Sequence, residues 1–257
     1  MKYIITIKLI LLISLNSIAQ EAIVDKIMLG ENLEEENKLY QYHNYDFSIL
    51  WSQTSNRNIY GIIGQNHKRL KVKLMSIIPT DNNLIYKVYG KSCVDGNICE
   101  FNGTIEIKKI LKLNKLHLGV DDEFKEAGLK DQGLIVANYK FEENIEQNHS
   151  GTFSGKLYSK WYIDNSNQIK YDNIQLQSDG YFNNAFVGVW VSHKTNQSKL
   201  CNWGDYRIPE CNSDFDVGAG EFSPSKKYYD RGWENYQNAW LNNNKEAQEI
   251  ELNEWWK

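Results

Sequence analysis

Signatures of common catalytic and nucleotide-binding sites are missing from this 257-residue sequence. It holds no G-x-S-x-G element of a serine hydrolase and no phosphate-binding loop. The G-x-G of Gly218-Ala219-Gly220 lacks the strand, third glycine and helix that a dinucleotide site requires. The five histidines form neither an H-x-H nor an H-E-x-x-H cluster, which argues against a histidine-based zinc site; they are His43, His67, His117, His149 and His193.

Long hydrophobic runs are also scarce. The apolar run Leu9 to Ile13 falls far short of the ~20 residues that a membrane-spanning helix needs, and no later segment reaches that length. Lysines before this run and the small residues Ser17 and Ala19 after it predict a signal peptide over 1–19. No cysteine lies near the cleavage point, so we expect a secreted or periplasmic chain without a transmembrane anchor or lipid, starting near Gln20.

The chain has no excess of basic residues. Its formal charge of −4 becomes −6 when the two lysines of the signal peptide are removed. Basic residues are scattered, and an acidic exported chain is a poor partner for nucleic acid or anionic membrane surfaces. A small molecule, a glycan or an envelope protein is the kind of partner that this composition leaves open.

Cysteine is sparse, but its even number in an exported chain favours disulfides. Cys93 and Cys99 flank a turn at Asp95-Gly96, which predicts a local bridge across a hairpin. Cys201 and Cys211 would close a second loop. A zinc site is the alternative, but paired C-x-x-C elements are missing and neither loop contains a histidine.

Period-two alternation dominates from residue 58 onward. Leu70, Val72 and Leu74 share one face, whereas Lys71 and Lys73 share the other, as in a half-buried strand. About eight to ten strands with short turns predict a mainly β fold, either an antiparallel meander barrel or a two-sheet sandwich. Besides the strand around Leu70, the predicted strands cover 84–91, 97–113, 134–141, 150–163, 169–176 and 186–193, with a polar crossover at 116–133.

The chain is thus divided into a signal peptide (1–19), a lead-in segment (20–57), an antiparallel β domain (58–205) and a loop-rich, helical C-terminal extension (206–257). In the extension Trp233, Tyr236 and Trp240 have the spacing of one helix face. We expect this helix to lie across an open edge or mouth of the sheet. The alternative is an exposed aromatic face for a partner or a sugar.

Residues 186–222 combine an apolar strand, two cysteines and many carboxylates. Their start, F-V-G-V-W (186–190), resembles the F/Y-x-G-x-W strand of lipocalins and related calycin barrels, in which the Trp plugs a barrel end. The resemblance implies a barrel that holds a small ligand. The segments C-N-W-G-D-Y-R-I-P and D-F-D-V-G-A-G-E-F-S-P are similar to a group of uncharacterised exported proteins of Bacteroidetes-type bacteria, which implies an envelope or secreted setting.

Several side chains of this stretch are candidates for a site. Asp205 and Arg207 fall on the same side of an extended segment and could pair, either as a scaffold or as an anion site. The predicted ligand-binding residues are Trp190, Trp203, Asp205, Tyr206 and Arg207. Asn212, Asp214 and Asp216 fall at every second position and are followed by Gly218, Gly220 and Glu221, which gives oxygen ligands on a bendable backbone as calcium requires, although the segment does not match an EF-hand loop. Asp205 and Glu221 are the candidate acid–base pair if the chain is a hydrolase.

The leading hypothesis is therefore an exported, non-enzymatic binding protein for a small molecule, a glycan or an envelope partner, with no cofactor unless calcium binds. One alternative is a secreted polysaccharide hydrolase that uses Asp and Glu in acid–base chemistry. Another is a structural or partner-binding envelope protein without a small ligand.

Overall fold

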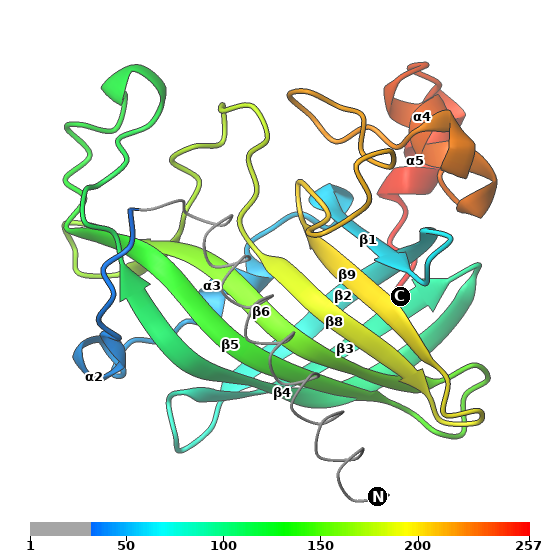
Figure 1. Cartoon of the computed structure of the whole chain (residues 1–257), viewed down its shortest axis with the longest axis horizontal. Coiled ribbons are helices and arrows are strands. Elements are labelled where there is room, and N and C mark those ends of the chain that lie inside the picture. The colour runs from blue at the N-terminus through cyan, green and yellow to red at the C-terminus, as the bar shows by residue number, and fades with distance from the viewer. Residues whose placement is uncertain (1–31) are drawn as a thin grey trace, which may run out of the picture.

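The computed structural model describes residues 32–257, so the signal-peptide prediction lies outside the described residues. Nine strands form one sheet in the order β5-β4-β3-β2-β1-β9-β8-β6-β7 (Figure 1). An additional pairing of β5 with β6 closes eight of them into a barrel, and β7 extends from β6 alone. The strands are β1 (Ile59–Ile63), β2 (Lys68–Pro79), β3 (Ile85–Val94), β4 (Asn97–Lys112), β5 (Asp131–Glu143), β6 (Gly151–Ile163), β7 (Ile169–Tyr171), β8 (Ala185–Ser192) and β9 (Ser198–Asp205).

Every neighbouring pair in the ring is antiparallel, and the strands follow the chain order apart from the short β7. The first and last strands, β1 and β9, pair along five positions from Ile59↔Asp205 to Ile63↔Cys201. The predicted antiparallel meander barrel is confirmed, and the sandwich is not formed. Closure pairs the edges that an open sheet would expose.

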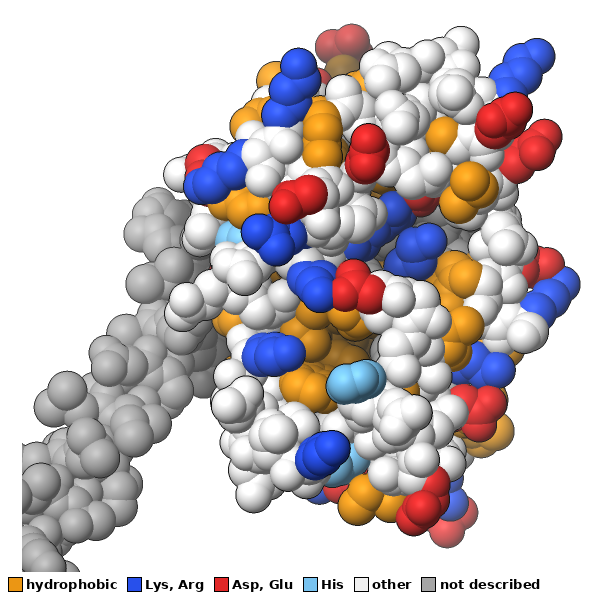
Figure 2. Space-filling model, turned by 90° about the vertical axis from the view of Figure 1, so that its right-hand side faces the viewer, with side chains coloured by type: hydrophobic (Ala, Val, Ile, Leu, Met, Phe, Trp, Pro, Cys, Tyr) orange, Lys and Arg blue, Asp and Glu red, His pale blue; other side chains and the backbone are white. Residues whose placement is uncertain are grey.

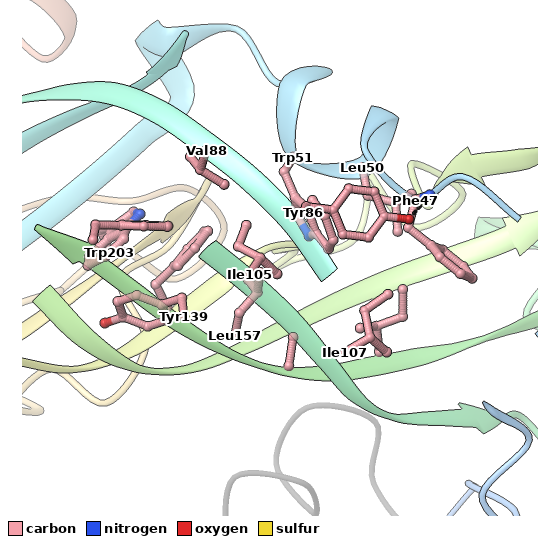
Figure 3. Packing of buried hydrophobic residues seen from close by; sticks show 14 of the residues in the cluster. Phe47, Leu50, Trp51, Tyr86, Val88, Ile105, Ile107, Tyr139, Leu157 and Trp203 are labelled. Atoms are coloured by element: carbon pink, nitrogen blue, oxygen red, sulfur yellow. Dashed lines mark hydrogen bonds between the residues drawn. The ribbon is translucent and has the colours of Figure 1, made fainter. Parts of the chain in front are cut away.

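Alternation along the strands fills the barrel with apolar side chains. Leu70 and Val72 of β2 point inward as predicted, and Lys71 lies on the other face. Figure 3 shows side chains from β3, β4, β5, β6 and β9 converging on the barrel axis. The interior cluster includes Leu70, Val72, Tyr86, Val88, Phe101, Ile105, Ile107, Tyr139, Phe141, Phe153, Leu157, Phe186 and Trp203.

A glycine pair lets β6 and β8 carry large rings in the interior. Gly155 and Gly188 lie directly opposite each other in the two strands. A Cβ atom on Gly188 would lie 2.2 Å from the Ser154 carbonyl oxygen and 2.6 Å from the Tyr139 hydroxyl. The central glycine of the F-V-G-V-W segment (186–190) is therefore required by the close approach of two strands and a tyrosine.

One end of the barrel is closed by the segment that precedes β1, which forms α2 (Leu39–Tyr42), α3 (Ile49–Ser52) and η1 (Asn56–Asn58). Trp51 of α3 packs edge-on against Tyr86 at 4.9 Å between ring centroids (Figure 3). Its indole nitrogen donates to Ser159 Oγ at 2.8 Å, and the Tyr86 hydroxyl accepts from the Phe47 backbone N–H at 2.9 Å. The expected partly helical lead-in is thus a plug for the barrel.

The C-terminal extension contains η3 (Lys226–Arg231), α4 (Glu234–Trp240) and α5 (Lys245–Leu252). The predicted helix exists, and Trp233, Tyr236 and Trp240 contribute to one cluster. This cluster packs on Tyr60 and Ile62 of β1, whose side chains lie on the outer face of the barrel wall, so the expected position across an open edge or mouth was wrong. Arg69 of β2 fixes α5 through a bidentate ion pair with Glu251, at 2.8 and 2.5 Å.

The predicted disulfides are wrong, because all four cysteines are free. Cys93 lies opposite Ile98, whereas Cys99 lies opposite the inward-facing Ser92, so the two thiols belong to opposite faces of the sheet. Cys201 lies inside the barrel, and Cys211 packs in the C-terminal cluster outside it. The barrel wall separates the second pair.

Two strand predictions also need correction. The predicted strand 169–176 ends at Tyr171, and β9 was not predicted, because its second half was assigned to the loop between Cys201 and Cys211. Another element, η2 (Val120–Asp122), lies in the polar crossover before β5. No helix within residues 32–257 has both the length and the apolar character needed to cross a membrane.

Candidate functional site

The end of the barrel opposite α3 is open. The turns β1–β2, β3–β4, β5–β6 and β8–β9 surround a hollow of about 1020 Å³ at this end. Figure 2 faces it and shows apolar side chains at the bottom, with basic side chains and a histidine around them. Because four strand pairs deliver residues to one ring, the hollow brings together side chains that are far apart in the sequence.

The floor of the hollow is apolar. It is formed by Ile63 of β1, Val94 of β3, Phe153 of β6 and Trp190 of β8. Below it lies the filled interior, where Trp203 stacks on Phe186 at 4.5 Å. The barrel therefore offers a shallow binding space at its mouth and a packed core beneath it.

Glu143, the last residue of β5, is a buried carboxylate in this floor. Its Oε2 accepts hydrogen bonds from the Gly151 backbone N–H at 2.7 Å and from the Trp190 indole N–H at 2.9 Å. Its Oε1 accepts from the Ser92 hydroxyl. Burial raises the pKa of Glu143, and these three donors oppose the rise.

Two free thiols share the inner wall with this carboxylate. Burial raises the pKa of Cys99 to about 11, and the negative charge of Glu143 contributes to the rise. The pKa of Cys201, which lies next to the floor on β9, is raised well above its ordinary value for the same two reasons. Both sulfurs therefore remain protonated thiols at neutral pH, which makes them poor nucleophiles.

The rim of the hollow is basic. Lys68 is neutralised by an ion pair with Asp95, which also lines the hollow. Lys194 and Lys199, both from the β8–β9 hairpin, form no ion pair with any residue of 32–257. The Lys199 ammonium lies 5.3 Å from the centre of the Trp190 ring, so a positive charge stands directly over the apolar floor.

The predicted site residues are divided between three places. Trp190 lines the hollow, whereas Trp203 is 2% exposed inside the core. Asp205 is buried at the closed end, where Oδ2 accepts from Thr54 Oγ1 at 2.7 Å, Tyr171 Oη at 2.9 Å and Asn184 Nδ2 at 2.6 Å. Burial raises the pKa of Asp205 to about 6.

The predicted ion pair between Asp205 and Arg207 is not formed. Arg207 instead pairs with Asp216 at 2.5 Å and donates to the carbonyl oxygens of residues 218–220 at 2.7 to 3.1 Å. Tyr206 adopts a positive φ of 66° and packs edge-on against Tyr181. Arg207 thus holds the loop of residues 216–220 in shape.

The candidate calcium and hydrolase carboxylates do not converge. Asp214 pairs with Lys227 at 2.7 Å, Asp216 with Arg207, and Glu221 is exposed. Over residues 32–257 no group of three or more His, Cys, Asp or Glu side chains is arranged to hold a metal ion. None of Asp205, Asp214, Asp216 and Glu221 lines the hollow at the mouth.

Glu143, Lys194 and Lys199 line the hollow and were not predicted from the sequence, and only Glu143 had a usable signal. The alternation of β5 places Tyr139, Phe141 and Glu143 on the inward face. The sequence pattern therefore could have predicted that Glu143 points into the barrel. The alternation does not predict which residues surround the carboxylate, because Ser92, Gly151 and Trp190 come from three other strands or their ends.

In comparisons with known proteins, no family model, no curated protein and no solved structure matches this chain. The type of ligand is therefore inferred from the size of the hollow and the residues that line it. A concave space of this size, with an apolar floor and mostly polar side chains around it, can hold a small organic molecule. Its buried carboxylate is occupied by three protein donors, which leaves it poorly placed to act as a catalytic base.

Proposed function

We propose that this chain is an exported binding protein that takes a small organic molecule into the mouth of its barrel. The observation that carries the proposal is the hollow of about 1020 Å³ with its floor of Ile63, Val94, Phe153 and Trp190. Ligand sites of proteins are typically concave, mostly apolar and about 300 to 1,000 Å³ in volume. A small molecule fits these features better than a flat protein partner.

The polysaccharide hydrolase is the less favoured alternative. Hydrolysis requires two carboxyl groups that face each other across a cleft at roughly 5 to 9.5 Å. Of the carboxylates at the mouth, Asp95 is paired with Lys68 and Glu143 is bonded to three protein donors. Neither carboxylate is free of protein partners, as the general acid or the general base of a hydrolase should be.

The proposal can be tested with N-phenyl-1-naphthylamine, an uncharged fluorophore that brightens in apolar surroundings. We expect saturable binding of one molecule per chain. Val94→Trp should place a larger ring in the hollow and weaken the signal, because Val94 lies in its floor. Val189→Trp is the matched control, since Val189 is a half-exposed valine on the outer face of β8. Absence of saturable binding, or equal binding by both variants, would contradict the proposal.

Export is a separate part of the proposal and has its own test. Expression of the whole sequence in a bacterium should yield a chain whose intact mass corresponds to cleavage after Ala19. Ala19→Arg should prevent this cleavage, because signal peptidase requires a small residue there. A cytoplasmic chain of full mass would contradict export and would leave the binding experiment unaffected.

A further inference from the structure

The charges around the mouth indicate the chemical class of the ligand. We propose that the ligand is an amphipathic molecule with one acidic group, which Lys194 and Lys199 hold above the apolar floor. This inference rests on the proposed function and adds a specific recognition element to it. The acidic group can be a carboxylate, a sulfonate or a phosphate, because all three offer oxygens to an ammonium group.

The balance of charge at the hollow is positive. Five acidic or lysine side chains line it within the described part of the chain, namely Lys68, Asp95, Glu143, Lys194 and Lys199. Lys68 and Asp95 neutralise each other, and Glu143 is buried with a raised pKa and three donors. The two lysines of the β8–β9 hairpin therefore determine the charge that an entering molecule meets.

This local charge is opposite in sign to that of the whole chain, which is −4. Some other lysines described here are paired with acids, for example Lys38 with Glu34, Lys91 with Glu100 and Lys227 with Asp214. Lys194 and Lys199 place two ammonium groups on one hairpin at the hollow, and neither forms an ion pair within residues 32–257. In a concave site, they raise the local concentration of anions.

The geometry couples the charge to the apolar floor. Lys199 extends over the Trp190 ring at 5.3 Å, and the same ring is 7% exposed and fixed by its hydrogen bond to Glu143. A ligand whose apolar body rests on Phe153 and Trp190 thus has its upper end beside Lys199. An acid at that end gains an ion pair, whereas a neutral polar end gains none.

A pair of fluorophores tests this directly. 1-Anilinonaphthalene-8-sulfonate has the same ring system as N-phenyl-1-naphthylamine with one added sulfonate, so the two differ only in the acidic group. We expect the sulfonate to bind more tightly in low salt. Its affinity should fall about threefold in Lys194→Gln or Lys199→Gln and roughly tenfold in the double variant, as expected for partly exposed ion pairs.

The controls separate this inference from the proposed function. The lysine variants should lower the affinity for the sulfonate more than the affinity for N-phenyl-1-naphthylamine, and added salt should weaken sulfonate binding. Lys125→Gln, in the crossover at the other end of the barrel, should change neither. Circular dichroism should confirm that every variant is folded.

Two outcomes contradict the inference in different ways. If the neutral fluorophore binds but the sulfonate gains nothing and the lysine variants have no effect, the mouth is a binding site without acid recognition. If neither fluorophore binds saturably, the proposed function fails together with this inference. Displacement of the sulfonate by decanoate but not by decanol would extend support from the fluorophore to a simple acidic amphiphile.

Discussion

The indole nitrogen of Trp190 donates to the carboxylate of Glu143 at 2.9 Å and links β8 to β5 across the intervening β6. Glu143 also accepts from Gly151 and Ser92, so its oxygens are engaged by three strands or strand ends. A buried carboxylate is retained in proteins when such donors compensate for lost hydration. The pair therefore fixes the floor of the mouth and the ring on which a ligand would rest.

The first prediction concerns the pH dependence that Glu143 confers on stability. Its pKa is raised in the folded protein, so the folded state keeps a proton that the unfolded state has already lost. Stability therefore falls as pH rises from the ordinary pKa of 4.5 to the raised value. Glu143→Gln should remove this fall, since its amide can accept from Trp190 and Gly151 and donate to Ser92.

Urea unfolding of both proteins at about pH 4 and about pH 7.5 measures this effect. The free energy of unfolding of the variant, relative to that of the wild type, should be higher at the upper pH. A difference that is the same at both pH values would show that burial of Glu143 does not shift its ionisation.

The second prediction concerns Asp205 at the closed end. Asp205→Ala leaves the buried donors of Thr54, Tyr171 and Asn184 without their acceptor and should lower stability by about 2 to 4 kcal/mol. The pKa of Asp205 is raised to about 6, so the wild type loses stability as pH rises from about 4 to 6. The loss caused by the substitution should thus be larger at pH 4 than at pH 7.

The control for Asp205 is Asp81→Ala in the exposed β2–β3 turn, which should change stability by less than about 0.5 kcal/mol. If Asp205→Ala lowered stability more at pH 7 than at pH 4, the folded protein would stabilise ionised Asp205 better than its burial implies.

The third prediction concerns the cysteines. Titration of the denatured, unreduced protein with a thiol reagent should detect all four thiols, because the barrel wall and the two sheet faces keep them apart. A reducing agent should leave the melting temperature unchanged. Detection of two thiols or none would show that the chain forms disulfides, and peptide mapping would then identify the pairs.

The fourth prediction concerns the plug at the closed end. Trp51→Ala should lower stability by about 3 to 5 kcal/mol, because it removes a buried ring packed on Tyr86 and a hydrogen bond to Ser159. Tyr40→Ala should have little effect, since Tyr40 is 88% exposed. Fluorophore binding by folded Trp51→Ala should be unchanged, and weaker binding would reveal coupling between the two ends.

Strand content and fold class could be predicted because most strands bury one face only. The alternation in β2, with Leu70 and Val72 inward, is the pattern from which such strands can be predicted. β9 lacked this pattern: Asn202 on its outer face is covered by the C-terminal segment and bonds to Pro209 O at 3.1 Å. A strand that is buried on both faces shows no alternation, so local pattern could not separate it from a loop.

The candidate site was predicted only in part. Trp190 was identified from an aromatic strand and does line the hollow. Asp205 and Arg207 are neighbours in sequence, but they enter separate networks, with Tyr171 and with Asp216. The contacts of Glu143, Lys194 and Lys199 depend on how the ring of strands closes, and sequence spacing within one segment carries no information on that closure.

The seam between β1 and β9 has a consequence for folding. Pairs such as Gly61↔Trp203 join residues near opposite ends of the β-forming chain, so loop entropy must be lost before these contacts compensate for it. Closing the seam should therefore be a late step, preceded by the local hairpins. A chain interrupted before Ser198 would leave β1 and β8 as bare edges, and self-association through those edges would compete with productive folding.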